Sequence, residues 1–170
     1  MRLAFYVVLM TLLGPLFGQE GKQNQFPETH YDRGMELYRE GRFNAAVAQF
    51  RNYLNVAGNS PQRSEAEYYY AISKLKAQHT DGVASLQQFL DQNPGSLKTN
   101  EANLALGDYY YLKPRYSNAL RYYKNVDEKS IDKELRSRLN YRKGFCLVNA
   151  KKYKDAVEVL KSVADAPGEY

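Results

Sequence analysis

The chain has few of the residues that usually build active sites. It contains two histidines, one cysteine and no tryptophan among its 170 residues. His30 and His79 stand 49 positions apart, and neither has a cysteine or carboxylate at the spacing of a metal site. Cys146 has no histidine near it in the sequence to activate it, and no phosphate loop, G-x-S-x-G or H-E-x-x-H motif occurs. The sequence therefore predicts no catalytic residues, no metal site and no cofactor.

A single cysteine also excludes an intramolecular disulfide, so the fold must be stabilised by packing alone. Cysteine is among the most often buried residue types. Cys146 is therefore predicted to be a small buried apolar residue rather than a redox or ligand thiol.

The chain lacks an apolar run long enough to cross a membrane comfortably. The longest run, Leu3–Phe17, has 15 residues, whereas a spanning helix needs about 18. Arg2 precedes the run and the small residue Gly18 follows it, which is the order typical of a secretory signal peptide. We expect residues 1–19 to be a cleaved signal peptide rather than a retained anchor, followed by a short linker at 20–27.

Acidic residues are scarce in the last third of the chain. Residues 113–161 contain 14 Lys/Arg and 6 Asp/Glu, whereas residues 20–112 contain 9 and 11. This basic segment is either a solvated helix face or a surface for an acidic protein or an anionic membrane, and export argues against nucleic acid. Its candidate patch comprises Arg136, Arg138, Arg142, Lys143, Lys151 and Lys152.

One short pattern occurs three times. RFNAAVAQF at 42–50 returns as RYSNALRYY at 115–123 and as KYKDAVEVL at 152–160. Each copy has a basic residue, an aromatic, then Ala three residues after the aromatic, and a bulky residue four after the Ala. Upstream of these copies and of one weaker unit stand small residues separated by 37, 36 and 37 positions, namely Gly34, Ala71, Gly107 and Gly144.

This spacing indicates paired helices. Apolar residues three and four positions from a small residue form one stripe on a helix. A small residue at the crossing point lets a second antiparallel helix approach to within about 8–10 Å. Gly41 and Pro114 fall in the short turns between the two helices. The chain is therefore predicted to be all-α and built of helical hairpins.

At these residues the chain resembles the tetratricopeptide repeat family. The family pattern has Leu-Gly, an aromatic three residues on, Gly-x-aromatic in the turn, and then Ala and a bulky residue. The second repeat is degenerate, because its turn is one residue short and Gly82 stands where Ala is usual. The third repeat matches best, with Leu106, Gly107, Tyr110, Tyr116, Ala119 and Tyr123.

The resemblance implies αα-hairpin repeats stacked in a right-handed superhelix, with about four repeats. They are expected near 28–60, 64–94, 98–128 and 134–166, so the array covers 28–166. A single hairpin cannot bury its own face, so stability comes from stacking. The last helix has no evident cover over its apolar residues. We therefore expect residues 167–170 to begin a further repeat or a tail, or the C-terminal face to self-associate.

The repeat period of 36–37 residues exceeds the family value of about 34. Exported members of the family in bacterial envelopes often have such lengthened linkers. The resemblance and the N-terminal pattern together imply an exported protein that is periplasmic or associated with the outer membrane.

In the family, the first helix of each repeat lines a concave groove. The groove positions that correspond here are Tyr31, Met35, Tyr38, Tyr68, Ile72, Leu75, Leu104, Asp108, Tyr111, Tyr141 and Phe145. Aromatic residues of this kind suit a groove that anchors a peptide or helix. The alternative is that superhelical curvature packs them against the neighbouring repeat as core.

These features predict a non-enzymatic protein–protein interaction scaffold that binds a partner protein in the groove, without nucleic acid. An alternative is an envelope assembly factor whose basic C-terminal face binds an acidic protein or lies near an anionic lipid surface. A third is a regulatory region joined to an enzyme beyond residue 170. Salt dependence separates the first two, because only the basic face should lose its partner at high ionic strength.

Overall fold

A computed structural model describes residues 27–164. The expected signal peptide at 1–19, the linker before Pro27 and residues 165–170 lie outside the described residues. Within the described part no helix is both long and apolar enough to cross a membrane.

The described residues form helices only, and the helices come in consecutive pairs. In chain order they are α1 Pro27–Arg39, α2 Phe43–Val56, α3 Arg63–Lys76, α4 Gly82–Gln92, α5 Thr99–Leu112, α6 Tyr116–Tyr123, α7 Lys133–Asn149 and α8 Tyr153–Ala164.

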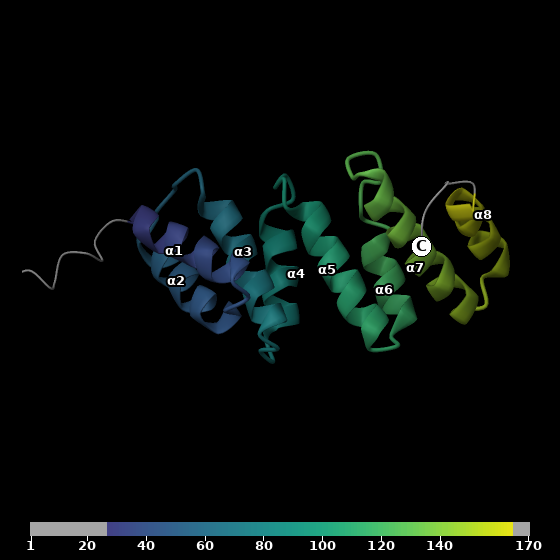
Figure 1. The fold of residues 1–170 in the computed structure, drawn as a ribbon, viewed down its shortest axis with the longest axis horizontal. Coiled ribbons are helices and arrows are strands. Elements are labelled where there is room, and N and C mark those ends of the chain that lie inside the picture. Colours follow the sequence, from purple (N-terminus) through teal and green to yellow (C-terminus); the bar gives the residue numbers. More distant parts are fainter. Residues whose placement is uncertain (1–26, 165–170) are drawn as a thin grey trace, which may run out of the picture.

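The pairs are stacked in a row from α1 to α8 (Figure 1). Each helix contacts the next one in the chain, and α1, α3, α5 and α7 also contact one another in sequence. Among the described helices, the second members of the pairs lie farther apart, although Gln87 of α4 donates to the Tyr122 hydroxyl of α6 at 2.5 Å. The first helices are therefore crowded together and form the concave side, which we call the first-helix face. The predicted all-α repeat fold is confirmed.

Glycine sets the close approach of the two helices within a pair. A Cβ added at Gly34 would lie 2.8 Å from the ring of Phe50, and one at Gly144 would lie 2.5 Å from Cγ of Leu160. At Gly107 it would collide with the buried ring of Tyr123. The bulky residue that ends each repeated pattern thus packs directly on the small residue of the preceding helix, as the spacing predicts.

In the second repeat the two helices also approach closely, but the glycine lies on the second helix. Here α3 has Ala71 at the crossing position. A Cβ at Gly82 would lie 2.7 Å from Cα of Leu75 and 2.8 Å from its backbone nitrogen. The first turn of α4 therefore rests on the backbone of α3. This close approach explains why glycine replaces the alanine of the other repeats.

The core runs continuously from α3 to α8, with a smaller cluster in the first repeat. Three alanines at the same repeat position, Ala46, Ala119 and Ala156, are 0–2% exposed. Tyr69 joins the two clusters, because its ring stacks on Phe50 at 5.7 Å between centroids. No repeat buries its apolar surface alone.

The helical turns use backbone conformations that favour glycine. Gly41 has φ +74°, and Gln78 and Lys151 have φ +59° and +58° at the equivalent position of their repeats. A residue with a Cβ pays about 1–2 kcal/mol in this left-handed region. Gly41 suits this region, whereas Gln78 and Lys151 are strained there.

Gln78→Gly is therefore expected to stabilise the fold by about 0.5–1 kcal/mol, because glycine relieves the strain but makes the unfolded chain more flexible. Urea denaturation of the two proteins would measure the difference. The adjacent Ala77 has φ −76°, so Ala77→Gly is the matched control and should be destabilising. If both glycines act alike, the turn is not strained at Gln78.

The linkers between repeats lie at one end of the helix pairs, and two of them are bonded to the first turn of the first helix in the preceding pair. Ser64 Oγ donates to Ser96 Oγ at 3.2 Å. Asn100 Nδ2 donates to Ser130 Oγ at 2.5 Å, and its Oδ1 accepts from the backbone N–H of Asp127 at 2.9 Å. These bonds fix the angle between successive pairs and so shape the first-helix face.

Candidate functional site

The first-helix face is the candidate site, and its exposure changes along the array. In the first two repeats most predicted groove residues are packed. Tyr68 and Ile72 are 6% and 3% exposed, and burial raises the pKa of the Tyr68 hydroxyl. Partly buried residues packed against the core clusters are Tyr31, Met35, Tyr38, Leu75, Leu104 and Tyr111.

Aromatic contacts show how this packing arises. Tyr31 lies against Phe50 and Tyr53, with ring centroids 6.1 and 5.4 Å apart. Tyr38 lies 5.0 Å from Tyr69 of the next repeat. Tyr31 thus packs on the second helix of its own repeat and Tyr38 on the neighbouring repeat, so in the N-terminal half the face is largely core.

In the last repeat the same face is open. Tyr141, Phe145 and Val148 of α7 are 53%, 38% and 43% exposed, and their spacing of four and three places them on one side of the helix. Phe145 packs edge-on against Tyr111 and Tyr116, at 5.6 and 5.5 Å between centroids. We call these five residues the aromatic patch. The rings support one another and still present apolar surface to solvent.

A hollow of about 260 Å³ lies beside the patch on the same face. We call it the central hollow. Its apolar floor comes from α1, α3, α5 and α7, and charged side chains stand among the apolar ones. The residues that line it are Tyr38, Tyr68, Ile72, Lys76, Glu101, Leu104, Ala105, Asp108, Leu135, Arg138, Leu139 and Arg142.

The two acidic groups of the central hollow are already paired. The Glu101 carboxylate accepts from Lys98 Nζ at 3.3 Å. Asp108 accepts from the Tyr123 hydroxyl at 2.7 Å and forms an ion pair with Arg142.

The remaining two cations of the hollow have no acidic partner within residues 27–164. Lys76 Nζ lies over the rings of Tyr38 and Phe43, at 5.4 and 5.2 Å from their centroids. Arg138 is exposed and has no hydrogen bond or ion pair to the described residues. The hollow therefore has two uncompensated positive charges.

The structure distributes the predicted basic patch over three places. Arg136 donates to the backbone carbonyls of Glu128 and Ile131, at 2.7 and 3.0 Å, and Lys143 pairs with Glu128 at 2.5 Å. These two residues hold the linker between α6 and α7. Arg138 and Arg142 instead line the central hollow.

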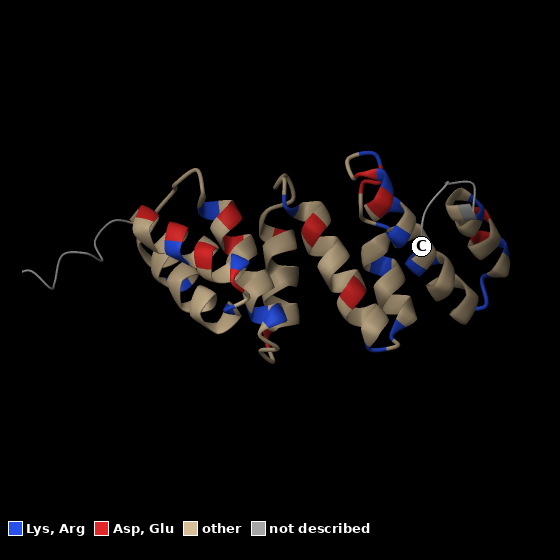
Figure 2. Cartoon of the chain, in the orientation of Figure 1, with Lys and Arg blue, Asp and Glu red and all other residues tan. Residues whose placement is uncertain are grey.

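Lys151 and Lys152 are exposed in the turn after α7. They lie about 20 Å from Arg136 along the helix axis, at 1.5 Å per residue. Figure 2 accordingly shows Lys and Arg scattered over the loops and helices of α6–α8. The six predicted basic residues do not share one surface, and two of them belong to the groove.

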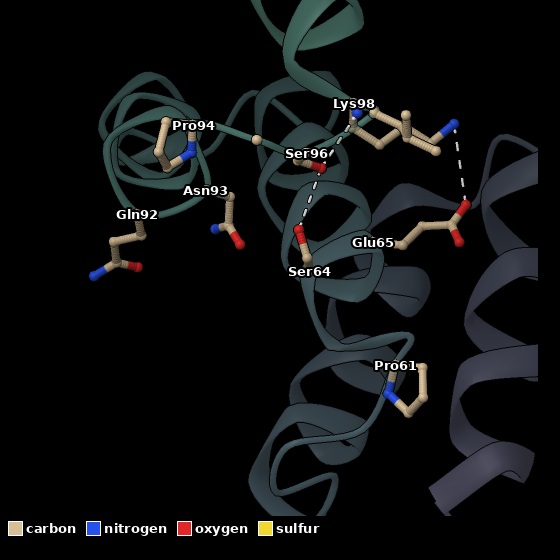
Figure 3. A pocket seen from close by; sticks show the side chains of 10 residues that line it. Pro61, Ser64, Glu65, Gln92, Asn93, Pro94, Ser96 and Lys98 are labelled. Carbon is tan, nitrogen blue, oxygen red and sulfur yellow. Dashed lines mark hydrogen bonds and ion pairs between the residues drawn. The ribbon is translucent and has the colours of Figure 1, made fainter.

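A second hollow, of about 620 Å³, lies at the linker end of the repeats (Figure 3). It is formed by the 93–98 loop and the start of α3. Ser96 bonds Ser64 and the backbone N–H of Lys98, and the Lys98 amine stands 4.0 Å from Glu65. Several of its polar side chains are thus bonded to one another, and these bonds connect the linker to the start of α3.

The two histidines and the single cysteine have structural roles in the fold. His30 bonds Gln49 at 2.8 Å and His79 bonds Asn44 at 2.7 Å, each joining two helices or a turn and a helix. Cys146 is fully buried. The described residues contain no group of three metal-ligating side chains.

Cys146 is expected to resist thiol reagents in the folded protein. Burial raises its pKa to about 11, so the neutral thiol is favoured and the reactive thiolate is rare at pH 8. Ellman's reagent at pH 8 should react at least about 100-fold more slowly with folded than with urea-unfolded protein. The reason is that this pH is about three units below the pKa of the folded thiol, which is also shielded from solvent. Equal rates would contradict the buried position of this thiol.

Sequence reasoning missed several residues of the face. Glu101 and Arg138 both stand six positions before the small residue of their repeats, about one helical turn N-terminal to the first predicted groove residue of each repeat. Tyr116 comes from a second helix and closes over the aromatic patch. Extending the predicted groove positions by one helical turn toward the N-terminus of each first helix would have included Glu101 and Arg138.

Comparisons with known proteins agree with this geometry. The family model described as Tetratricopeptide repeat matches residues 76–132. The solved structure of MamA from AMB-1 has a TM-score of 0.65, with 20% identity over 84% of this chain and 74% of that chain. No curated protein matches the sequence. The likeness to MamA establishes the fold.

Proposed function

We propose that this chain, which has a tetratricopeptide-repeat fold and matches the repeat model over residues 76–132, is a non-catalytic scaffold that binds a segment of a partner protein on its first-helix face. The observation that supports this proposal best is the exposed aromatic patch. Its residues lie on the concave side, where a bound segment would contact several repeats at once.

The patch has the features of a binding surface rather than an accidental exposure. Tyr and Phe are enriched at interface centres, since they bury a large area with few rotatable bonds. Tyr111, Tyr116 and Phe145 hold one another in place, so little conformational freedom is lost on binding. The patch is flanked by the central hollow, which offers depth for a side chain of the partner.

We also propose that the protein functions outside the cytoplasm, in a bacterial envelope. The basis is the order of charge, apolar run and small residue at positions 1–19. Mass spectrometry of the N-terminus from fractionated cells tests it. A chain that begins near residue 19 or 20 in the envelope fraction supports export, and an intact Met1 in the cytosol opposes it.

Loss of the patch should weaken partner binding. The Tyr141→Ala/Phe145→Ala variant is expected to lose at least about tenfold in affinity, because central aromatic anchors each contribute about 1 kcal/mol or more. Partners captured by the parent chain from an extract of the native cells would be compared with those captured by the variant.

The matched control removes two exposed apolar side chains elsewhere. Val56 and Leu97 are 59% and 95% exposed and lie off the patch, so Val56→Ala/Leu97→Ala should keep the partner. A partner retained by a folded patch variant would refute the proposed site. If that partner were also lost at high salt, a charged site would become the better candidate, either the basic turn at Lys151 and Lys152 or the cations of the central hollow.

A further inference from the structure

Two of the cations that line the central hollow are not paired with acidic groups of the described residues. Lys76 comes from α3 and Arg138 from α7, and both line the hollow without an acidic partner among the described residues. The acids beside them, Glu101 and Asp108, are already paired with Lys98 and Arg142. A partner that brought only apolar groups would cover these cations without compensating them, which costs free energy.

We propose that the bound segment places an acidic side chain in the central hollow, between Lys76 and Arg138, and a large apolar side chain on the aromatic patch. This inference rests on the proposed function and specifies the partner's chemistry. The carboxylate would accept charge-assisted hydrogen bonds from the amine and the guanidinium. The apolar floor beneath them strengthens such bonds by reducing the solvation of the charges.

The spacing of the two contacts follows from α7. Arg138, Arg142 and Phe145 stand at intervals of four and three, so they lie on one side of the helix. Arg142 joins the two sites, because it lines the hollow and its guanidinium lies 5.5 Å from the ring centroid of Tyr111. Seven residues of helix rise about 10 Å. An extended segment covers that distance in about three residues, at about 3.3 Å each.

The bound segment is therefore expected to have Asp or Glu about three positions from Phe, Tyr, Leu or another large apolar residue if it is extended. A helical segment would need about seven positions for the same distance. Both forms differ from a purely apolar ligand by their dependence on salt.

Selection of peptides tests the inference directly. A random 12-residue phage library would be selected on the full chain, and the affinities of individual peptides would be measured on variants. Lys76→Gln/Arg138→Gln removes the two charges and keeps polar side chains at exposed positions. Arg51→Gln/Lys124→Gln removes two exposed cations outside the groove and is the control.

The expected peptides contain an acid near an apolar anchor. They should lose about tenfold in affinity on Lys76→Gln/Arg138→Gln and little on the control, as expected for two partly exposed ion pairs. Raising the ionic strength from about 0.1 to about 1 M should weaken binding to the parent, because the screening length falls from about 10 to about 3 Å. Lys76→Glu/Arg138→Glu should select Lys- or Arg-containing peptides instead.

The outcomes separate the two proposals. Peptides that need Tyr141 and Phe145 but lack acids and tolerate the charge variant would overturn this inference and leave the groove function standing. Peptides indifferent to both sets of substitutions, or no selectable peptide, would count against both. Circular dichroism and urea denaturation of each variant show whether it is folded, so a loss of binding is not mistaken for a loss of structure.

Discussion

Tyr123→Ala is expected to lower the free energy of unfolding by about 3–5 kcal/mol, the range for removing a fully buried aromatic ring. Tyr123 is the largest fully buried side chain of the core. Its ring packs directly on Gly107, and its hydroxyl bonds Asp108 at 2.7 Å. Removal of the ring leaves a cavity at the helix crossing of the third repeat.

Urea denaturation followed by circular dichroism measures this effect. Tyr123→Phe is the matched control, since it keeps the ring and removes only the hydroxyl. Its cost should be about 1.5–3 kcal/mol, the value of one hydrogen bond to a charged group. Equal losses for the two variants would show that the hydrogen bond, and not the packing of the ring on Gly107, stabilises this crossing.

Gly82→Ala is expected to lower the free energy of unfolding by about 2–3 kcal/mol. Helix propensity alone predicts the opposite, because alanine is favoured over glycine within helices by about 0.5–1 kcal/mol. The added Cβ, however, would lie 2.7 Å from the backbone of Leu75. Backbone atoms cannot rotate away as a side chain can, so α3 and α4 would have to separate.

Gly95→Ala is the control for this substitution. A Cβ at Gly95 meets nothing within 4 Å, so the change should stay within about 0.5 kcal/mol. A stabilised Gly82→Ala protein would show that the second repeat tolerates the alanine found in the other repeats. The close approach of α4 to α3 would then not be the reason for the glycine.

The sequence predicts the helix crossings well because their cause is local. Gly34, Gly107 and Gly144 each stand at a fixed distance from the bulky residue that covers them, and a helix of constant pitch turns that distance into a contact. The second repeat breaks the pattern. From the sequence Gly82 is a missing alanine, whereas in the fold it is the point of closest approach.

Exposure of the groove could not be predicted in the same way. Tyr68 and Tyr141 occupy the same position in their repeats, yet the first is 6% and the second 53% exposed. The difference depends on the packing against neighbouring repeats, which no single repeat encodes. The expected groove therefore divides into a packed N-terminal part and an open last repeat.

The charges illustrate the same limit. Arg136, Arg138, Arg142 and Lys143 form one basic cluster in the sequence, but successive helical residues point in different directions. Arg136 and Lys143 hold the linker, whereas Arg138 and Arg142 enter the hollow. The sequence does not show which of these basic residues are already paired within the fold. That becomes clear only from the positions of their acidic partners Glu128 and Asp108.

Site-specific photo-crosslinking in the native cells tests the groove function most directly. A photoreactive residue would replace Tyr141 on the first-helix face or, as control, the exposed Arg51 or Gln88 on second helices. The proposed function predicts a crosslinked partner from position 141 and none from 51 or 88. A partner crosslinked only from 51 or 88 would contradict it.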